Sequence, residues 1–129
     1  MTQDQLLQMA ADARLNAYAP YSNFKVGAAL RVATGQVFTG GNVENISYGL
    51  TICAERVAVG SAVQAGITEF DHLAIVTDSA EPVVPCGACR QVLAEFCPDL
   101  PIISQTVAGV TAEFALSTLL PKPLQGILG

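Results

Sequence analysis

The first part of the chain carries apolar residues at the spacing of an α-helix. Thr2 and Gln5 stand three residues apart at the start of this pattern, which is the arrangement of a capping box, and Pro20 follows it. Because a capping box starts a helix and proline cannot continue one, the pattern predicts a helix that begins after Thr2 and ends before Pro20.

From Phe24 onward the hydrophobic period changes to two, the period of a β-strand. Phe24 and every second residue after it, up to Val32, place apolar side chains on one face of the predicted strand. Residues 33–36 have the composition of a turn and 37–39 predict a return strand, so the two strands form a hairpin. The glycine pair at 40–41 predicts a loop.

The rest of the chain alternates helical and strand patterns. A helix predicted over 52–65 is almost wholly apolar or small beyond Glu55 and Arg56, so we expect it to be buried on all sides. The further predicted elements are a strand at 73–77, a helix at 87–96, strands at 101–107 and 110–116, and an irregular tail at 121–126. This alternation predicts a single α/β domain over residues 1–129, layered around one sheet.

The composition restricts the classes of partner. Hydrophobic residues make up 51% of the chain and charged residues only 13%, which predicts that part of the surface is buried against other subunits. The net charge is −5, and no cluster of Lys and Arg provides the electrostatic footprint of nucleic-acid binding. We therefore expect a small, neutral ligand and no nucleic acid.

The sequence also bears on location. The N-terminal residues lack the basic and apolar regions of a secretory signal, and no apolar run reaches the roughly 18 residues of a membrane helix. We expect a cytoplasmic protein without membrane contact. In a reducing compartment its four cysteines serve metal binding or catalysis before disulfides.

Three cysteines and one glutamate form the strongest chemical signal. Cys53 lies two residues before Glu55, and Cys86 and Cys89 follow in the order Pro-Cys-x-x-Cys. Both groups open predicted helices, where the helix dipole favours thiolate over thiol. Three thiolates from two helix starts can hold a zinc ion and leave its fourth position open, as catalytic zinc sites do.

A closed structural zinc site would need a fourth ligand. Cys97 lies eight residues beyond Cys89, roughly 12 Å along a helix axis, and His72 has no ligand spacing to any cysteine. We expect Cys97 to be a small, at least partly buried thiol and His72 to be a surface or boundary histidine. A structural zinc clip and a set of unrelated buried thiols remain the alternatives to a catalytic site.

Charged residues beside the cysteines suggest how such a site works. Glu55 can take a proton from water near the metal and pass it to a substrate nitrogen; the alternative is a solvated glutamate at a helix start. Three thiolates on Zn²⁺ leave a net charge of −1, which weakens its action as a Lewis acid. Arg56 can offset this by donating to a thiolate, with Arg90 as a second candidate; either can instead be a surface arginine.

At these residues the chain resembles the small, homotetrameric cytidine deaminases, whose zinc motif has the same order. Further similarity lies in the segments 21–30, 41–48, 53–56, 85–91 and 119–121, so it extends over nearly the whole chain. The resemblance implies a three-layer α/β/α fold with a mixed five-stranded sheet and one zinc ion per subunit. It also implies hydrolysis of cytidine and 2′-deoxycytidine to uridine, 2′-deoxyuridine and ammonia.

The resemblance further implies roles for residues outside the zinc motif. Asn42 and Glu44 would hydrogen-bond the ribose hydroxyls, which suits an amide and a carboxylate, although both residues could simply support a turn. Phe24 would pack against the pyrimidine while belonging to the core. The backbone N–H of Ala54 would reach the carbonyl of the base, and Tyr48 would lie near a subunit contact.

One position departs from the family pattern. Leu124 stands where the family usually has an aromatic residue that reaches over the base in a neighbouring subunit. Without this aromatic residue, base binding would be weaker or bulkier bases would be admitted. A deaminase for N4-modified cytidine or blasticidin S is therefore one alternative. A polynucleotide-editing deaminase and a non-catalytic zinc module are two others. The acidic charge opposes the first of these, and the intact Glu55 opposes the second.

Overall fold

The computed structural model describes residues 1–125, which form a five-stranded sheet in the order β2-β1-β3-β4-β5. Strands β3 and β4 run parallel, and the other neighbouring pairs are antiparallel. The elements, in chain order, are α1 (Gln3–Arg14), β1 (Val26–Val32), β2 (Val37–Gly41), the 3₁₀ helix η1 (Tyr48–Leu50), α2 (Ala54–Gln64), β3 (Phe70–Thr77), α3 (Gly87–Phe96), β4 (Pro101–Thr106), β5 (Thr111–Ala115) and α4 (Leu116–Leu119).

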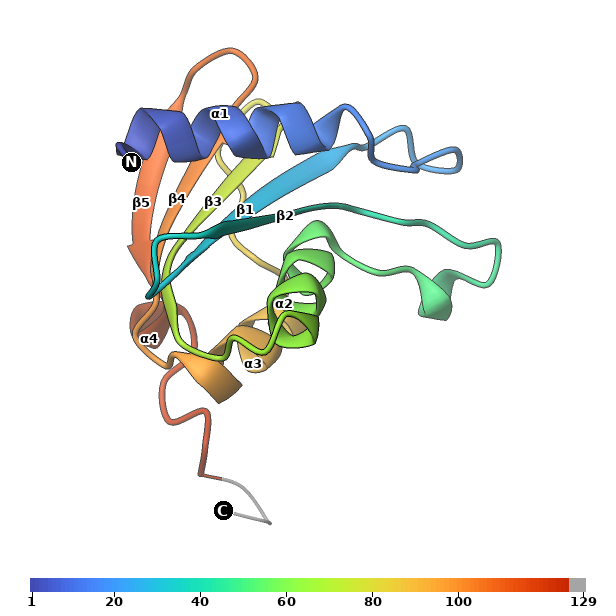
Figure 1. The fold of residues 1–129 in the computed structure, drawn as a ribbon. Helices are drawn as coiled ribbons and strands as arrows, with labels where there is room; N and C mark the ends of the chain where they lie inside the picture. The colour runs from blue at the N-terminus through green and yellow to red at the C-terminus, as the bar shows by residue number, and fades with distance from the viewer. Residues whose placement is uncertain (126–129) are drawn as a thin grey trace.

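Helices cover both faces of the sheet. Helix α1 lies on one face, and α2 and α3 lie on the other (Figure 1). Alternation along β1 sends Ala28 and Leu30 into the core shared with α2 and α3, whereas Ala29 joins the smaller cluster under α1. Both faces of this strand are therefore buried, and the predicted three-layer α/β/α fold is confirmed.

Most predicted elements are present with shifted ends. The capping box of Thr2 and Gln5 starts α1, and α3 has the predicted bounds. The strand predicted from Phe24 begins only at Val26, after Asn23 takes a left-handed backbone conformation with φ 57°. Helix α4 was not predicted. Residues 121–125 form neither helix nor strand, as predicted, and Gly126 lies outside the described residues.

The prediction of a loop at the glycine pair 40–41 is wrong, because both residues belong to β2. A Cβ on Gly40 would lie 2.4 Å from the Ala54 carbonyl oxygen, at the start of α2. On the opposite face, a Cβ on Gly41 would lie 3.0 Å from Ala17 Cα. Glycine stands in this strand because two backbones approach it, one on each side.

Helix α2 is not buried on all sides, so the prediction made from its apolar composition is wrong on this point. Ala54, Glu55, Ala58, Val59 and Ala62 are buried against the sheet and α3. The opposite side carries exposed residues, among them Val63 with 41% of its surface accessible. An apolar helix thus keeps one open face.

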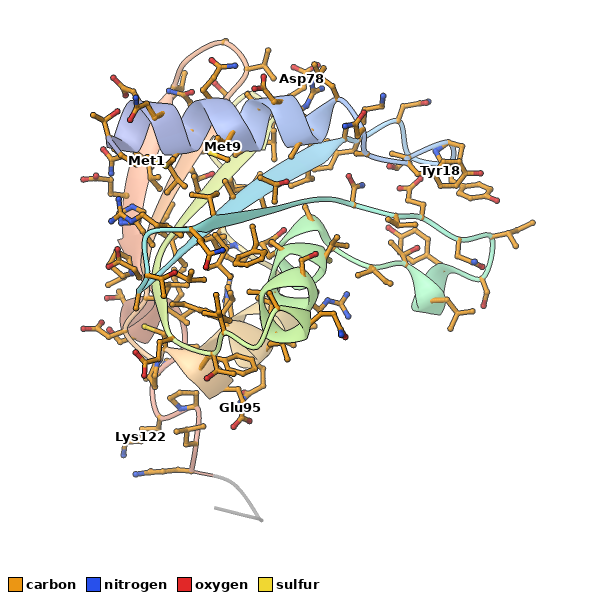
Figure 2. The ribbon with its side chains drawn as sticks, viewed as in Figure 1. Met1, Met9, Tyr18, Asp78, Glu95 and Lys122 are labelled. Carbon is orange, nitrogen blue, oxygen red and sulfur yellow. The ribbon has the colours of Figure 1, made fainter. Side chains whose placement is uncertain are left out.

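Two segments extend beyond the sheet at the ends of α1 and β2. We call residues 15–25 and 42–53 the projecting segments (Figure 1). A backbone bridge from Tyr18 to Val43 joins them, and a second bridge, from Val43 to Ile52, lies within the second segment; Tyr18 is labelled there in Figure 2. Their exposed apolar side chains include Ile46, with 84% of its surface accessible.

No helix within residues 1–125 combines the length and the apolar character needed to cross a membrane.

Candidate active site

The starts of α2 and α3 bring three cysteines together. Cys53 is the N-cap of α2, Cys86 is the N-cap of α3, and Cys89 lies in the first turn of α3. Sγ of Cys86 lies 3.8 Å from Sγ of Cys53 and 3.4 Å from Sγ of Cys89. All three sulfurs lie within 4.8 Å of one another.

This sulfur arrangement fits zinc. A tetrahedral zinc ion with Zn–S bonds of about 2.3 Å holds its sulfurs about 3.8 Å apart, close to the separations seen here. Within residues 1–125 these cysteines form the one cluster of three or more His, Cys, Asp or Glu side chains with metal-binding geometry. Three thiolates match the chemistry of zinc and leave room for a further ligand.

The protein also favours a thiolate at this point. Hydrogen bonding from Cys89, assisted by Arg56, lowers the pKa of the Cys53 thiol to about 5. The same bond to Cys53, together with burial, raises the pKa of the Cys89 thiol. A negative charge on Cys53 is thus stabilised by its neighbours even before a cation is added.

Glu55 occupies the first turn of α2 beside the sulfurs, with only 5% of its surface accessible. Burial, with a smaller contribution from the Cys53 charge, raises the pKa of this carboxyl group. Glu55 lines a cavity of about 280 Å³ together with Cys53 and Cys86. Glu55 and two of the three cysteines of the candidate zinc site therefore line the same small space.

The two arginines differ in their contacts. Arg56 Nη2 donates to Cys53 Sγ over 3.5 Å, so its positive charge lies against the sulfur cluster. The hydrogen bonds of Arg90 go instead to backbone carbonyls, from Nε to Pro85 at 2.7 Å and from Nη1 to Leu119 at 3.5 Å. Arg90 therefore holds the residue before Cys86 rather than a sulfur.

Glu44 also lines the cavity and is hydrogen-bonded to the first projecting segment. Its Oε1 accepts from the backbone N–H groups of Tyr21 at 3.0 Å and Ser22 at 3.1 Å. Its Oε2 accepts from the Ser22 hydroxyl at 2.5 Å. These bonds, with that hydroxyl as the largest contributor, hold the pKa of Glu44 below its usual value.

Asn42 is buried beside Glu44 and joins β2 to the start of β1. Its Oδ1 accepts from the Val26 N–H at 2.8 Å, and its Nδ2 donates to the Phe24 carbonyl at 2.9 Å. One N–H and one lone pair of the amide are left for a ligand. Asn42 thus supports the local backbone and still lines the cavity.

The remaining predicted positions fall in two places. Phe24, Ala54 and Tyr48 line the cavity. Phe24 exposes 39% of its surface and so is not a core residue as expected, because it precedes β1; Tyr48 exposes 73%. Leu124 lies outside the cavity wall, in the tail that Gln91 Nε2 binds through the Pro123 carbonyl at 3.0 Å.

The sequence interpretation did not single out several other cavity residues, namely Ser22, Val26, Thr51, Ile75, Val83 and Val84. Ser22 lies within the segment that carried the family resemblance, and that was the one signal available for it. Cys97 is half-buried at the end of α3, and His72 is half-buried on β3, as expected for both.

The chain matches known deaminases over most of its length. The family model for the cytidine and deoxycytidylate deaminase zinc-binding region matches residues 1–104. A cytidine deaminase of Halalkalibacterium halodurans is 48% identical over 122 residues, which cover 94% of this chain and 92% of that one. A blasticidin-S deaminase of Bacillus cereus is 32% identical over 104 residues, or 74% of each chain.

The fold gives the same result. The crystal structure of a cytidine deaminase from Burkholderia pseudomallei superposes with a TM-score of 0.91 and 49% identity, over 95% of this chain and 98% of that one. Since the family match extends over residues 1–104 and the two cytidine deaminases align over more than nine-tenths of each chain, this chain belongs to the zinc-binding cytidine and deoxycytidylate deaminase family.

Proposed function

We propose that this protein catalyses the hydrolytic deamination of cytidine and 2′-deoxycytidine to uridine and 2′-deoxyuridine, with release of ammonia. One observation carries the proposal. One cavity is lined by two candidate zinc ligands, by the buried Glu55 and by two candidate sugar-binding residues. The zinc ligands are Cys53 and Cys86, and the sugar-binding residues are Asn42 and Glu44. The cavity volume of about 280 Å³ lies near the lower end of small-molecule sites, which suits a free nucleoside.

In this proposal Cys53, Cys86 and Cys89 hold one zinc ion. When bound, zinc acidifies a water molecule and so supplies a nucleophile at neutral pH. Glu55 takes a proton from the attacking water and passes it to N3 as the water oxygen adds to C4. It then takes the proton of the new C4 hydroxyl and delivers it to the departing amino group, so that the C4 carbonyl forms, the C4–N bond breaks and ammonia leaves. The raised pKa of Glu55 suits a group that both accepts and donates protons.

The rest of the cavity binds the substrate. Asn42 and Glu44 hydrogen-bond the sugar hydroxyls, and Phe24 packs against the pyrimidine. Ala54 is the first residue of α2, so its N–H has no partner within the helix and can donate to the carbonyl of the base. Arg56 holds a positive charge against Cys53, which offsets part of the negative charge of three thiolates.

We also propose that the protein is a cytoplasmic homotetramer and that residues 1–129 form its single domain. The exposed apolar side chains of the projecting segments, including Ile46, Tyr48 and Leu50, support burial against other subunits. Light scattering coupled to size exclusion should give the mass of four chains, and Ile46→Asp should reduce it. A monomeric wild type would refute the assembly but not the reaction.

The direct test follows the change in ultraviolet absorbance when cytidine loses its amino group, together with ammonia release and zinc content. Purified protein should turn over cytidine and 2′-deoxycytidine, lose activity with a zinc chelator and regain it with zinc. Zinc-loaded protein that leaves both nucleosides unchanged would refute the proposal.

A deaminase of altered base specificity is the second candidate, and Leu124 is the observation that favours it. This residue exposes 52% of its surface, and an aromatic stack there would add about 0.5–1.5 kcal/mol beyond its buried area. The values of kcat/KM for cytidine, N4-methylcytidine and blasticidin S should be compared between wild type and Leu124→Phe. Unchanged ratios would exclude a role of Leu124 in base selection.

A further inference from the structure

The Ser22 hydroxyl takes part in two hydrogen bonds whose directions can be assigned. The backbone N–H of Phe24 can only donate, so the 3.0 Å contact makes Ser22 Oγ an acceptor. The ionised Glu44 carboxylate can only accept, so the 2.5 Å contact to Oε2 uses the single hydroxyl hydrogen. One hydroxyl therefore connects the backbone of Phe24 to the Glu44 carboxylate, and both residues line the cavity.

These bonds leave Glu44 with little unused capacity. A carboxylate has about four acceptor positions, two on each oxygen. Backbone N–H groups of Tyr21 and Ser22 occupy both positions on Oε1, and the Ser22 hydroxyl occupies one on Oε2. The remaining position on Oε2 is the one that can receive a hydroxyl from a ligand in the cavity. Its direction depends on where the Ser22 hydroxyl holds this oxygen.

Within the proposed function, we propose that Ser22 is a positioning residue for the substrate's sugar, because its hydroxyl sets the orientation of Glu44 Oε2. Ser22 lies on the first projecting segment, whereas Glu44 lies on the second. The bond therefore also links the two projecting segments beside the cavity.

The first test is the steady-state kinetics of Ser22→Ala with cytidine. Loss of a hydrogen bond to a charged group predicts a KM increase of roughly tenfold, with kcat within about twofold of wild type. Ser22→Thr keeps the hydroxyl and should restore KM to within about threefold of wild type. Ser22→Cys keeps a similar shape with only a weak S–H donor and should raise KM as Ala does, which tests the same bond if Ser22→Ala proves unstable.

A double-mutant cycle separates positioning from a general effect on folding. If Ser22 acts through Glu44, the KM of Ser22→Ala/Glu44→Ala should equal that of Glu44→Ala alone. Ser117→Ala is the matched control, because Ser117 Oγ also donates to a carboxylate, that of Asp99, and lies on α4 outside the cavity wall. It should leave KM and kcat unchanged.

The outcomes distinguish the two proposals. A zinc-loaded wild type without cytidine turnover would overturn the proposed function. An active wild type with unchanged KM in Ser22→Ala and Ser22→Cys, or with independent effects of Ser22→Ala and Glu44→Ala, would overturn the role of Ser22 alone. A rise in KM that Thr reverses and that disappears in the Glu44→Ala background supports it.

Discussion

Arg56 Nη2 lies 3.5 Å from Cys53 Sγ, and the two residues are one helical turn apart at the start of α2. The contact follows from helix geometry, since residues three apart share a face. The sulfur in turn raises the pKa of Arg56, which keeps the guanidinium charged. A permanent positive charge therefore accompanies the Cys53 thiol, whose pKa is lowered.

Replacement of Arg56 should weaken catalysis more than folding. Arg56→Gln removes the charge from Cys53 and should lower zinc affinity or kcat by roughly 10–100-fold, the usual effect of losing a partner of a metal ligand. Kinetics at saturating zinc and metal titration would separate the two effects. Arg31→Gln is the control, since it removes an arginine paired with Asp71 away from the sulfurs. Unchanged zinc affinity and kcat in Arg56→Gln would show that the Arg56 charge does not support the zinc site.

Glu55 should be required for turnover but not for metal binding. Glu55→Gln keeps the size of the buried side chain and removes proton transfer, which should lower kcat by a factor of roughly 10²–10⁴. Zinc content measured by elemental analysis should stay at one ion per chain. Substantial residual turnover would exclude Glu55 as the proton-transfer group.

Glu44 should make stability depend on pH in the acid range. Its pKa is lower in the folded protein than in the unfolded chain, mainly through the Ser22 hydroxyl. Such a group stabilises the fold above its unfolded pKa, and this contribution is lost as the pH falls through its folded pKa. The melting temperature of wild type should therefore exceed that of Glu44→Gln at neutral pH, and the difference should shrink as acid is added. If the difference in melting temperature grows as the pH falls, the pKa of Glu44 is not lowered by folding.

Gly40 should be needed for the placement of α2. A Cβ there would lie 2.4 Å from the Ala54 carbonyl oxygen and 2.7 Å from the Ala58 nitrogen. Gly40→Ala should lower stability by about 1–3 kcal/mol and reduce zinc occupancy, because α2 carries Cys53. Gly60→Ala on the same helix has nothing within 4 Å of its Cβ and should stabilise by up to about 1 kcal/mol. Equal melting temperatures for the two variants would refute the explanation.

The sequence predicted the features that depend on local chemistry. The helix starts at Cys53 and Cys86 follow from short-range patterns, and the spacing of the cysteines indicated zinc before any contact was known. The capping box at Thr2 likewise depends on residues only three apart. The family resemblance extended this to the fold and to the proposed ligands of the sugar.

Features that depend on distant contacts could not be predicted in this way. The glycine pair at 40–41 looks like a loop because the two backbones that require it come from elsewhere in the chain. Arg90 resembles Arg56 in its position next to a cysteine, yet its partner at Leu119 lies 29 residues away. The bond from Ser22 to Glu44 joins two segments whose approach depends on the whole sheet.

The two carbonyls bound by Arg90 connect helix α4 to the segment that carries the candidate zinc ligand Cys86. One guanidinium joins Leu119, the last residue of α4, to Pro85, the residue before Cys86. A displacement of the segment after α4 can therefore reach Cys86, a candidate zinc ligand, through a single side chain. A fusion partner or truncation placed there should be judged by the zinc that the protein retains, and not only by its yield.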